Sequence, residues 1–125
     1  MNKLILACAA AVAGCGGDLT APIRPQPFDP PAVYVGWASD LLLCFHGHPG
    51  DPVGLVASIE WRAVEGFENE SPGLHIHGEW DDGVVYLRTY AIEWRQAVVH
   101  EMIHHLLWGD PMHRDPRWRC QNDPY

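Results

Sequence analysis

The chain has 125 residues, which suits a single small domain, and it carries a formal net charge of −8 at pH 7 with its eight histidines neutral. An acidic chain repels nucleic acids and anionic lipid surfaces. The composition therefore argues against nucleic-acid partners.

Residues 1–14 predict an export signal. A short polar start carrying Lys3 is followed by an apolar run that is too short to cross a bilayer as a permanent helix. Because Lys3 is the only lysine, its removal with the signal leaves seven arginines against sixteen acidic residues. The mature chain would then be slightly more acidic than the whole.

The tetrapeptide Val12-Ala13-Gly14-Cys15 resembles the lipobox of bacterial lipoproteins. The resemblance implies that Cys15 is lipidated and becomes the first mature residue, and several acyl chains on one residue anchor a protein stably to a membrane. Gly16, where an aspartate would retain the protein in the inner membrane, implies the outer membrane of the bacterial cell envelope. The alternative is an ordinary cleaved signal with an incidental cysteine.

Residues 15–32 are rich in proline and predict a tether. Prolines at this density favour extended polyproline conformations, so we expect a semi-rigid spacer that lifts the domain off the membrane. The alternative is an extended arm packed on the domain, with Phe28 as the side chain that docks. The folded domain is expected to cover residues 33–125.

The first part of the domain carries mixed signals. Residues 41–45 form a short apolar run that suits either a buried strand or the end of a helix. Glycines and prolines predict a loop over residues 46–52. The apolar, partly β-branched pattern of residues 53–64 predicts a strand, and residues 65–73 predict a second loop.

A β-hairpin is predicted next. Residues 74–80 and 84–87 are strand-like and flank Asp81-Asp82-Gly83. An Asp-Gly pair between two such runs is a strong hairpin signal.

A long helix follows the hairpin. We expect Thr89 as its N-cap and Trp108 as its last residue, because Gly109 supplies a left-handed cap and Pro111 cannot continue a helix. One apolar stripe of this helix is predicted to pack on the core, namely Ile92, Val99, Met102, Ile103 and Leu106.

The same helix carries the motif His-Glu-x-x-His at residues 100–104. Residues four apart lie one turn above another, so His100 and His104 present two imidazoles to one point, with Glu101 beside them. Imidazole nitrogens are common zinc ligands, and a carboxylate next to a zinc site can move a proton from water to a leaving amine. The motif is a signature of zinc proteases for these reasons.

The segment from His100 to Leu107, followed by His113-Arg114-Asp115-Pro116-Arg117-Trp118, resembles the SprT-like group of minimal zincin metallopeptidases. The resemblance implies an α+β fold, in which a small, mostly antiparallel sheet packs on the active-site helix. It also implies a zinc site with His100, His104 and His113 as ligands and Glu101 as general base. Proteolysis of DNA-bound proteins is not implied, because this chain is acidic and exported.

The residues themselves leave alternatives for the third ligand. No glutamate follows Glu101, so Asp110, His113 and Asp115 are the candidates on the C-terminal side of the helix. His113 is favoured because the glycine and proline after the helix turn the chain back. The two aspartates are expected either to orient a ligand imidazole or, equally, to cap helices and form turns.

The remaining histidines are expected to be structural or solvent-facing: His46, His48, His75, His77 and His105. His105 is rotated by roughly 100° from the ligand that precedes it, which turns it away from the metal. Cys44 and Cys120 remain as an even pair in an oxidising compartment and are expected to form a disulfide, the alternative being two free buried thiols.

The sequence therefore predicts a zinc-dependent peptidase that acts on peptide or protein substrates. The alternatives are a non-catalytic, zinc-containing binding or structural lipoprotein and a zinc amidase that cleaves cell-wall peptide links. Three tyrosines are candidates for stabilising an oxyanion, and none is favoured: Tyr86, Tyr90 and Tyr125.

Overall fold

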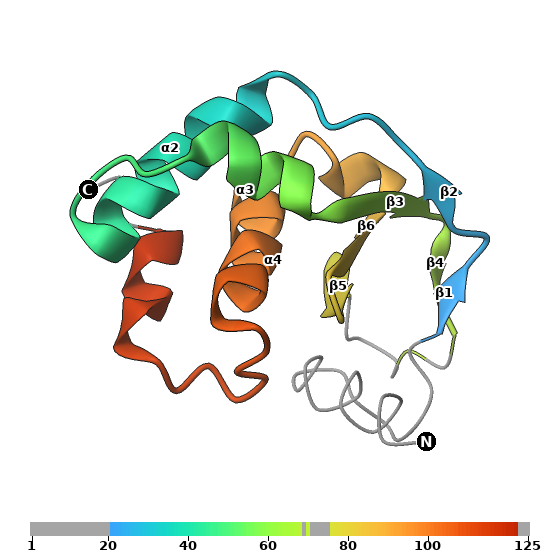
Figure 1. Ribbon diagram of the computed structural model, residues 1–125. Coiled ribbons are helices and arrows are strands. Elements are labelled where there is room, and N and C mark those ends of the chain that lie inside the picture. The colour runs from blue at the N-terminus through green and yellow to red at the C-terminus, as the bar shows by residue number, and fades with distance from the viewer. Residues whose placement is uncertain (1–20, 69, 71–75, 123–125) are drawn as a thin grey trace.

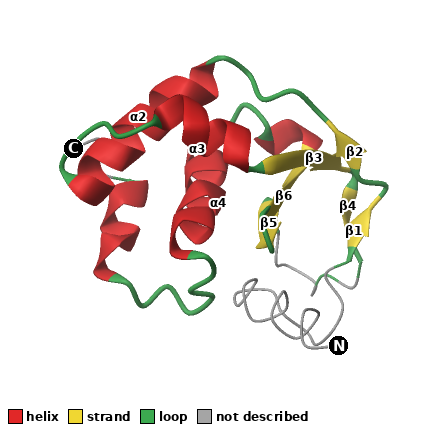
Figure 2. Ribbon diagram, viewed as in Figure 1, coloured by secondary structure: helices red, strands yellow, loops and turns green. Residues whose placement is uncertain are grey.

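The computed structural model describes residues 21–68, 70 and 76–122 (Figure 1). The chain has an α+β fold, in which a group of helices lies beside a small sheet (Figure 2). The predictions of a signal and of a lipidated Cys15 fall outside the described residues. Within them, no helix has both the length and the apolar character needed to cross a membrane.

The main sheet has four strands in the order β2-β3-β6-β5. These strands are β2 (Gln26–Pro27), β3 (Glu60–Val64), β5 (Gly78–Asp81) and β6 (Val84–Arg88). The two outer pairings are antiparallel, as predicted, and the central pairing of β3 with β6 is parallel. Parallel neighbours need a long connection, and here the connection contains the first strand of the hairpin.

The N-terminal segment is a packed arm. Strand β1 (Pro22–Ile23) pairs with β4 (Gly66–Phe67), and β2 then extends the main sheet beside β3. The Phe28 N–H donates to the carbonyl of Trp61 at 3.3 Å, and the two rings lie 6.2 Å apart. The prediction of a spacer is therefore wrong for this part of the chain, where the alternative of a docked arm holds, and the fold begins before residue 33.

Helix α2 (Val33–His46) follows the arm and ends at Gly47, whose φ of 79° caps it in the left-handed region. The apolar run at 41–45 is thus the end of a helix. Helix α3 (Pro52–Ser58) occupies the first half of the predicted strand at 53–64, so that prediction is wrong there. Asp51 accepts a hydrogen bond from the Gly54 N–H at 2.9 Å, and a proline at the first position favours a helix start over a strand.

Strands β5 and β6 form the predicted hairpin. Asp81 pairs with Val84, so the turn consists of Asp82 and Gly83, both with positive φ (51° and 91°). That backbone matches the right-handed twist of the strands on either side. The first strand begins at Gly78, later than predicted, and β4 lies in the region predicted as a loop because β1 provides its partner.

Helix α4 (Arg95–Leu107) carries the metal motif and differs from the prediction at both ends. Thr89 does not cap it: residues Thr89–Ala91 form a separate 3₁₀ turn, and the Tyr34 hydroxyl donates to the Ile92 carbonyl at 2.5 Å. At the other end the left-handed cap is Trp108 itself, with φ 50°, rather than Gly109.

The core is built on one face of α4. Val98, Val99, Met102 and Ile103 are fully buried there, against apolar side chains of α2 and the sheet. The final element is the 3₁₀ helix η2 (Pro116–Gln121), which the Cys44–Cys120 disulfide joins to α2 as predicted. Helix α4, which carries the metal motif, and η2, which follows it, are thus both held against α2.

Candidate metal centre

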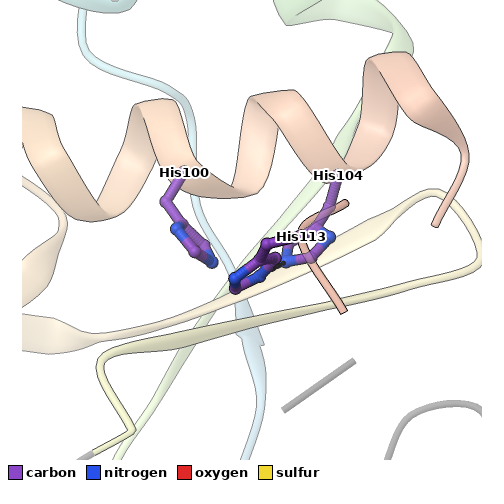
Figure 3. A group of neighbouring side chains, drawn as sticks. All are labelled: His100, His104 and His113. Atoms are coloured by element: carbon purple, nitrogen blue, oxygen red, sulfur yellow. Dashed lines mark hydrogen bonds between the residues drawn. The ribbon is translucent and has the colours of Figure 1, made fainter. Parts of the chain in front are cut away.

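The structure brings the three predicted histidine ligands together. His100 and His104 lie on successive turns of α4, and His113 returns to them from the loop after the helix (Figure 3). One ring nitrogen of each lies within 4.8 Å of those of the other two. These three residues are placed to hold a metal ion.

The spacing of the nitrogens suits a tetrahedral ion. His104 Nε2 and His113 Nε2 are 3.2 Å apart. Two nitrogens bound at about 2.0–2.1 Å to one tetrahedral zinc ion are separated by about 3.3 Å. His104 is buried and His113 is exposed, so the cluster opens to solvent on the side of His113. An open side of this kind leaves room for water or substrate.

The loop from α4 to η2 turns by using left-handed backbone at side-chain-bearing residues. Trp108, Asp110 and His113 all have φ between 50° and 56°, which non-glycine residues seldom adopt. The Asp110 carboxylate holds the turn, because it accepts hydrogen bonds from the N–H groups of Arg114 and Asp115 and from Trp118 Nε1 at 3.1, 2.9 and 2.6 Å.

Neither aspartate competes with His113 as a ligand. Burial opposes ionisation of Asp110, but the three hydrogen bonds it accepts outweigh that effect and lower its pKa. Asp115 caps η2 through the Arg117 N–H, and its hydrogen bonds from Arg117 lower its pKa to about 2. Of the roles predicted for these residues, turn formation and capping are the ones they have.

Hydrogen bonds fix the orientation of both helical imidazoles. His104 Nδ1 donates to the Gly109 carbonyl at 2.7 Å, and His100 Nδ1 donates to Gln121 Oε1 at 3.1 Å. Because these oxygens can only accept, each Nδ1 carries the proton and each Nε2 keeps its lone pair. Zinc-binding histidines are held in this way by partners outside the ligand set.

Burial keeps the three imidazoles in the neutral form that can bind a metal. It lowers the pKa of His100 to about 4, with a further contribution from His104, and lowers the pKa of His104 to about 4. It lowers the pKa of His113 as well. All three imidazoles are therefore neutral at pH 7, as metal coordination requires.

Glu101 follows His100 in α4, and its side chain is in an unusual environment. It is only 4% exposed, and its Oε2 has no hydrogen-bond partner among the described residues. Burial, reinforced by the nearby Glu79, raises its pKa well above the ordinary value. A Cβ on Gly78 would lie 3.3 Å from Glu101 Cγ, so the absence of a side chain there lets β5 approach the glutamate closely.

The sequence did not identify three neighbours of the site. The Trp118 ring contacts all three ligand rings, at centroid distances of 4.9, 4.7 and 4.2 Å from His100, His104 and His113. Gln121 orients His100, and Glu79 is a buried acid next to Glu101. Trp118 belongs to the segment that resembles the SprT-like group, but no spacing rule indicated its contacts or those of Gln121.

The other histidines make different contacts. His105 accepts from Trp80 Nε1 at 3.2 Å and therefore donates through Nε2 to Ser58 Oγ at 3.0 Å. His77 shares a hydrogen bond with the Tyr90 hydroxyl, and His46 and His48 stack on each other. His75 lies outside the described residues.

None of the three tyrosines that the sequence offers as oxyanion donors is favoured by its contacts among the described residues. Tyr86 packs against the second apolar cluster, formed by Val64, Phe67 and Ile76, and the Tyr90 hydroxyl is engaged by His77. Tyr125 falls in the part of the chain that the structure does not describe.

Comparisons of the chain with protein-family models, with curated proteins and with solved structures found no match. The resemblance to the SprT-like group therefore stays a prediction from the sequence.

Proposed function

We propose that this protein is a zinc-dependent peptidase in which His100, His104 and His113 bind the metal and Glu101 acts as general base. One observation carries the proposal: the residue that follows His100 in α4 is a buried glutamate whose Oε2 has no hydrogen-bond partner among the described residues, on the same helix that brings two of the three converging imidazoles together. An unsatisfied buried polar group costs about 1–3 kcal/mol, so a purely structural metal site would be more stable without it. Carboxyl groups in such environments are typical of catalytic sites.

Zinc is the ion that fits best. Three neutral imidazoles at tetrahedral spacing, with one side open, match the ligand set of catalytic zinc sites. Magnesium and calcium prefer oxygen ligands, and the cluster offers none.

The reaction follows from the groups at the site. When bound, zinc supplies a Lewis acid that polarises a carbonyl oxygen and makes water more acidic. Glu101 takes a proton from the attacking water as the new C–O bond forms, and it passes this proton to the amide nitrogen as the C–N bond breaks. The products are a carboxylic acid and an amine. Burial raises the pKa of Glu101, which makes its carboxylate a stronger proton acceptor than an exposed glutamate.

The experiment that tests this proposal compares Glu101→Gln with a matched change of the exposed Glu93 to glutamine. The purified wild-type chain should contain about one zinc ion, because catalytic sites bind a single ion through three ligands. Glu101→Gln should retain zinc and lose roughly 10²–10⁴-fold in peptide hydrolysis, the usual contribution of general acid–base catalysis. Glu93→Gln should behave like the wild type.

Other results would point elsewhere. A wild-type chain without zinc would reject both the site and the peptidase. Zinc without cleavage in a broad peptide library would favour the non-catalytic lipoprotein. Cleavage restricted to peptidoglycan fragments would favour the amidase of cell-wall peptide links.

The proposed setting is the bacterial cell envelope, with the chain anchored through a lipid on Cys15. The Cys44–Cys120 disulfide supports an oxidising compartment. Fractionation of cells should recover the full chain with membranes, in the outer-membrane fraction, and Cys15→Ala should release it or leave it unprocessed. A soluble, fully processed wild-type chain would contradict the lipid anchor.

A further inference from the structure

Element η2 contributes no metal ligand, yet it contacts the ligand set at two points. Trp118 packs against all three rings, and Gln121 Oε1 accepts from His100 Nδ1 at 3.1 Å. The hydrogen bond from His100 to Gln121 occupies Nδ1 and therefore leaves Nε2 of His100 to bind a metal.

The two helical ligands are oriented by different kinds of group. His104 donates to a backbone carbonyl, that of Gly109, which every residue possesses. His100 donates to the side chain of Gln121, so its orientation depends on the identity of a residue 21 positions along the chain. A substitution of Gln121 can therefore remove the hydrogen bond that orients His100 while all three imidazoles remain in place.

A covalent link joins the residue next to Gln121 to helix α2. Cys120 is buried and forms a disulfide with Cys44 of α2. Helix α2 also packs against α4. Helix α2 therefore supports both the element that carries His100 and the element that carries its partner. Without the disulfide, η2 would keep only noncovalent contacts with this framework.

We infer that Gln121 is a positioning residue of the metal centre, that it holds His100 with Nε2 directed at the metal, and that the Cys44–Cys120 disulfide keeps it within reach. This inference rests on the proposed function only in requiring that the three histidines bind zinc. Gln121 touches no reacting atom, so its effect is expected on metal affinity.

The chain provides a matched control. Gln96 Nε2 donates to Asn122 Oδ1 at 2.8 Å, which links the same two segments, α4 and the end of η2, without touching a ligand. A general role in fastening the tail to the helix would be lost equally in Gln96→Met and Gln121→Met. If Gln121 positions His100, only Gln121→Met, and not Gln96→Met, should weaken zinc binding.

The experiment measures zinc affinity of the full chain by competition with a chromogenic chelator, with zinc as the only added ligand. Gln121→Met, which has a similar size but no acceptor at this point, should bind zinc 10–100-fold more weakly, the usual loss when a partner of a metal ligand is removed. Gln121→Glu should restore wild-type affinity, because a carboxylate also accepts from Nδ1. Gln96→Met should bind zinc like the wild type.

The disulfide is tested with the double variant Cys44→Ala/Cys120→Ala, in which no new thiol can bind the metal. Its zinc affinity should fall, and adding Gln121→Met should lower it by less than in the wild type, because both changes act on the same contact. Circular dichroism of the metal-free proteins identifies any variant that does not fold, and the Gln121 series remains decisive in that case.

Two outcomes would overturn the inference while leaving the proposed function intact. One is wild-type zinc affinity in Gln121→Met, and the other is an equal loss in Gln96→Met. A folded double variant with wild-type affinity would reject the role of the disulfide. By contrast, a wild-type chain that binds no zinc would reject the proposed function itself.

Discussion

The metal centre and the sheet beside it are assembled over very different distances in the sequence. The three histidines that converge, the proposed general base Glu101 and the residues that orient the helical imidazoles lie within residues 100–121. The main sheet instead joins strands between Gln26 and Arg88, including a parallel pair that is not consecutive in the chain. The proposed metal site is therefore assembled from neighbouring residues, whereas the sheet that supports it joins distant ones. Substitutions in the two regions should separate metal binding from stability.

The largest effect should come from removing the ligand that lies outside the helix. His113→Ala should lower zinc affinity roughly a thousandfold, about 4 kcal/mol, because a three-ligand site loses one of its bonds. The unfolding temperature of the metal-free protein should stay close to that of the wild type, since His113 is exposed. Competition with a chelator measures the affinity, and His48→Ala, at another exposed histidine, is the control. Unchanged affinity would reject His113 as a ligand.

A substitution in the core on the face of α4 away from the histidines should have the opposite result, with lower stability and unchanged zinc binding. Met102→Ala should lower the free energy of unfolding by about 3 kcal/mol, because Met102 is fully buried and its truncation leaves a cavity. Urea denaturation measures the loss, and zinc stoichiometry should stay the same. Met112→Ala removes the same side chain at a position that is 52% exposed and should have little effect. Equal losses in the two variants would contradict the core described above.

Glu101→Gln should stabilise the metal-free protein at pH 7 by about 1 kcal/mol, since it replaces a buried acid with a neutral amide. Differential scanning calorimetry after removal of metal would measure a rise in Tm of roughly 5 °C. Together with the loss of hydrolysis, this would demonstrate a site in which stability is sacrificed for activity. A lower Tm than that of the wild type would count against an unsatisfied Glu101.

The pH dependence of the same variant is a further test. His100 and His104 have folded pKa values near 4, below the unfolded value, so their stabilising contribution is complete above about pH 6.5 and is lost as the pH falls toward 4. Glu101 has a raised folded pKa, so its contribution is present at low pH and is lost as the pH rises. The two effects oppose each other. Metal-free Glu101→Gln should therefore lose stability more steeply than the wild type between pH 6.5 and 4, and parallel curves would refute this assignment.

A smaller loss of stability than that of Met102→Ala should arise at the edge of the sheet formed by β2. Phe28→Ala should lower the free energy of unfolding by about 1–2 kcal/mol, because Phe28 is partly buried against the Trp61 ring. Zinc affinity should not change. Val33→Ala, at an exposed position just after the arm, is the comparison. A wild-type stability in Phe28→Ala would indicate that the arm contributes no packing energy.

The same contrast explains what could be predicted from the sequence. The convergence of the three histidines, the hairpin and the disulfide could be predicted because each depends on a local pattern or on a small number of candidates, such as histidines four apart or one remaining pair of cysteines. The place of His113 needed only a turn after the helix. The function of the site was predicted from the same residues and stays a proposal.

The errors have physical causes that act across the chain. The proline-rich arm looked like a spacer because its partners, β3 and β4, lie about forty residues away. The valines of α3 favour a strand, so the sequence predicts one there, although Asp51 and Pro52 form a helix start signal. Gln121 and Trp118 were missed because their roles depend on where the disulfide and Asp110 hold η2.

The packed arm also sets a working distance. With the lipid on Cys15 that we propose, only residues 16–21 lie between the anchor and strand β1 at Pro22, where the chain pairs with β4. Fully extended, such a length spans at most about 25 Å. On that proposal, this length and the size of the folded domain together would limit how far from the membrane the three histidines can reach a substrate.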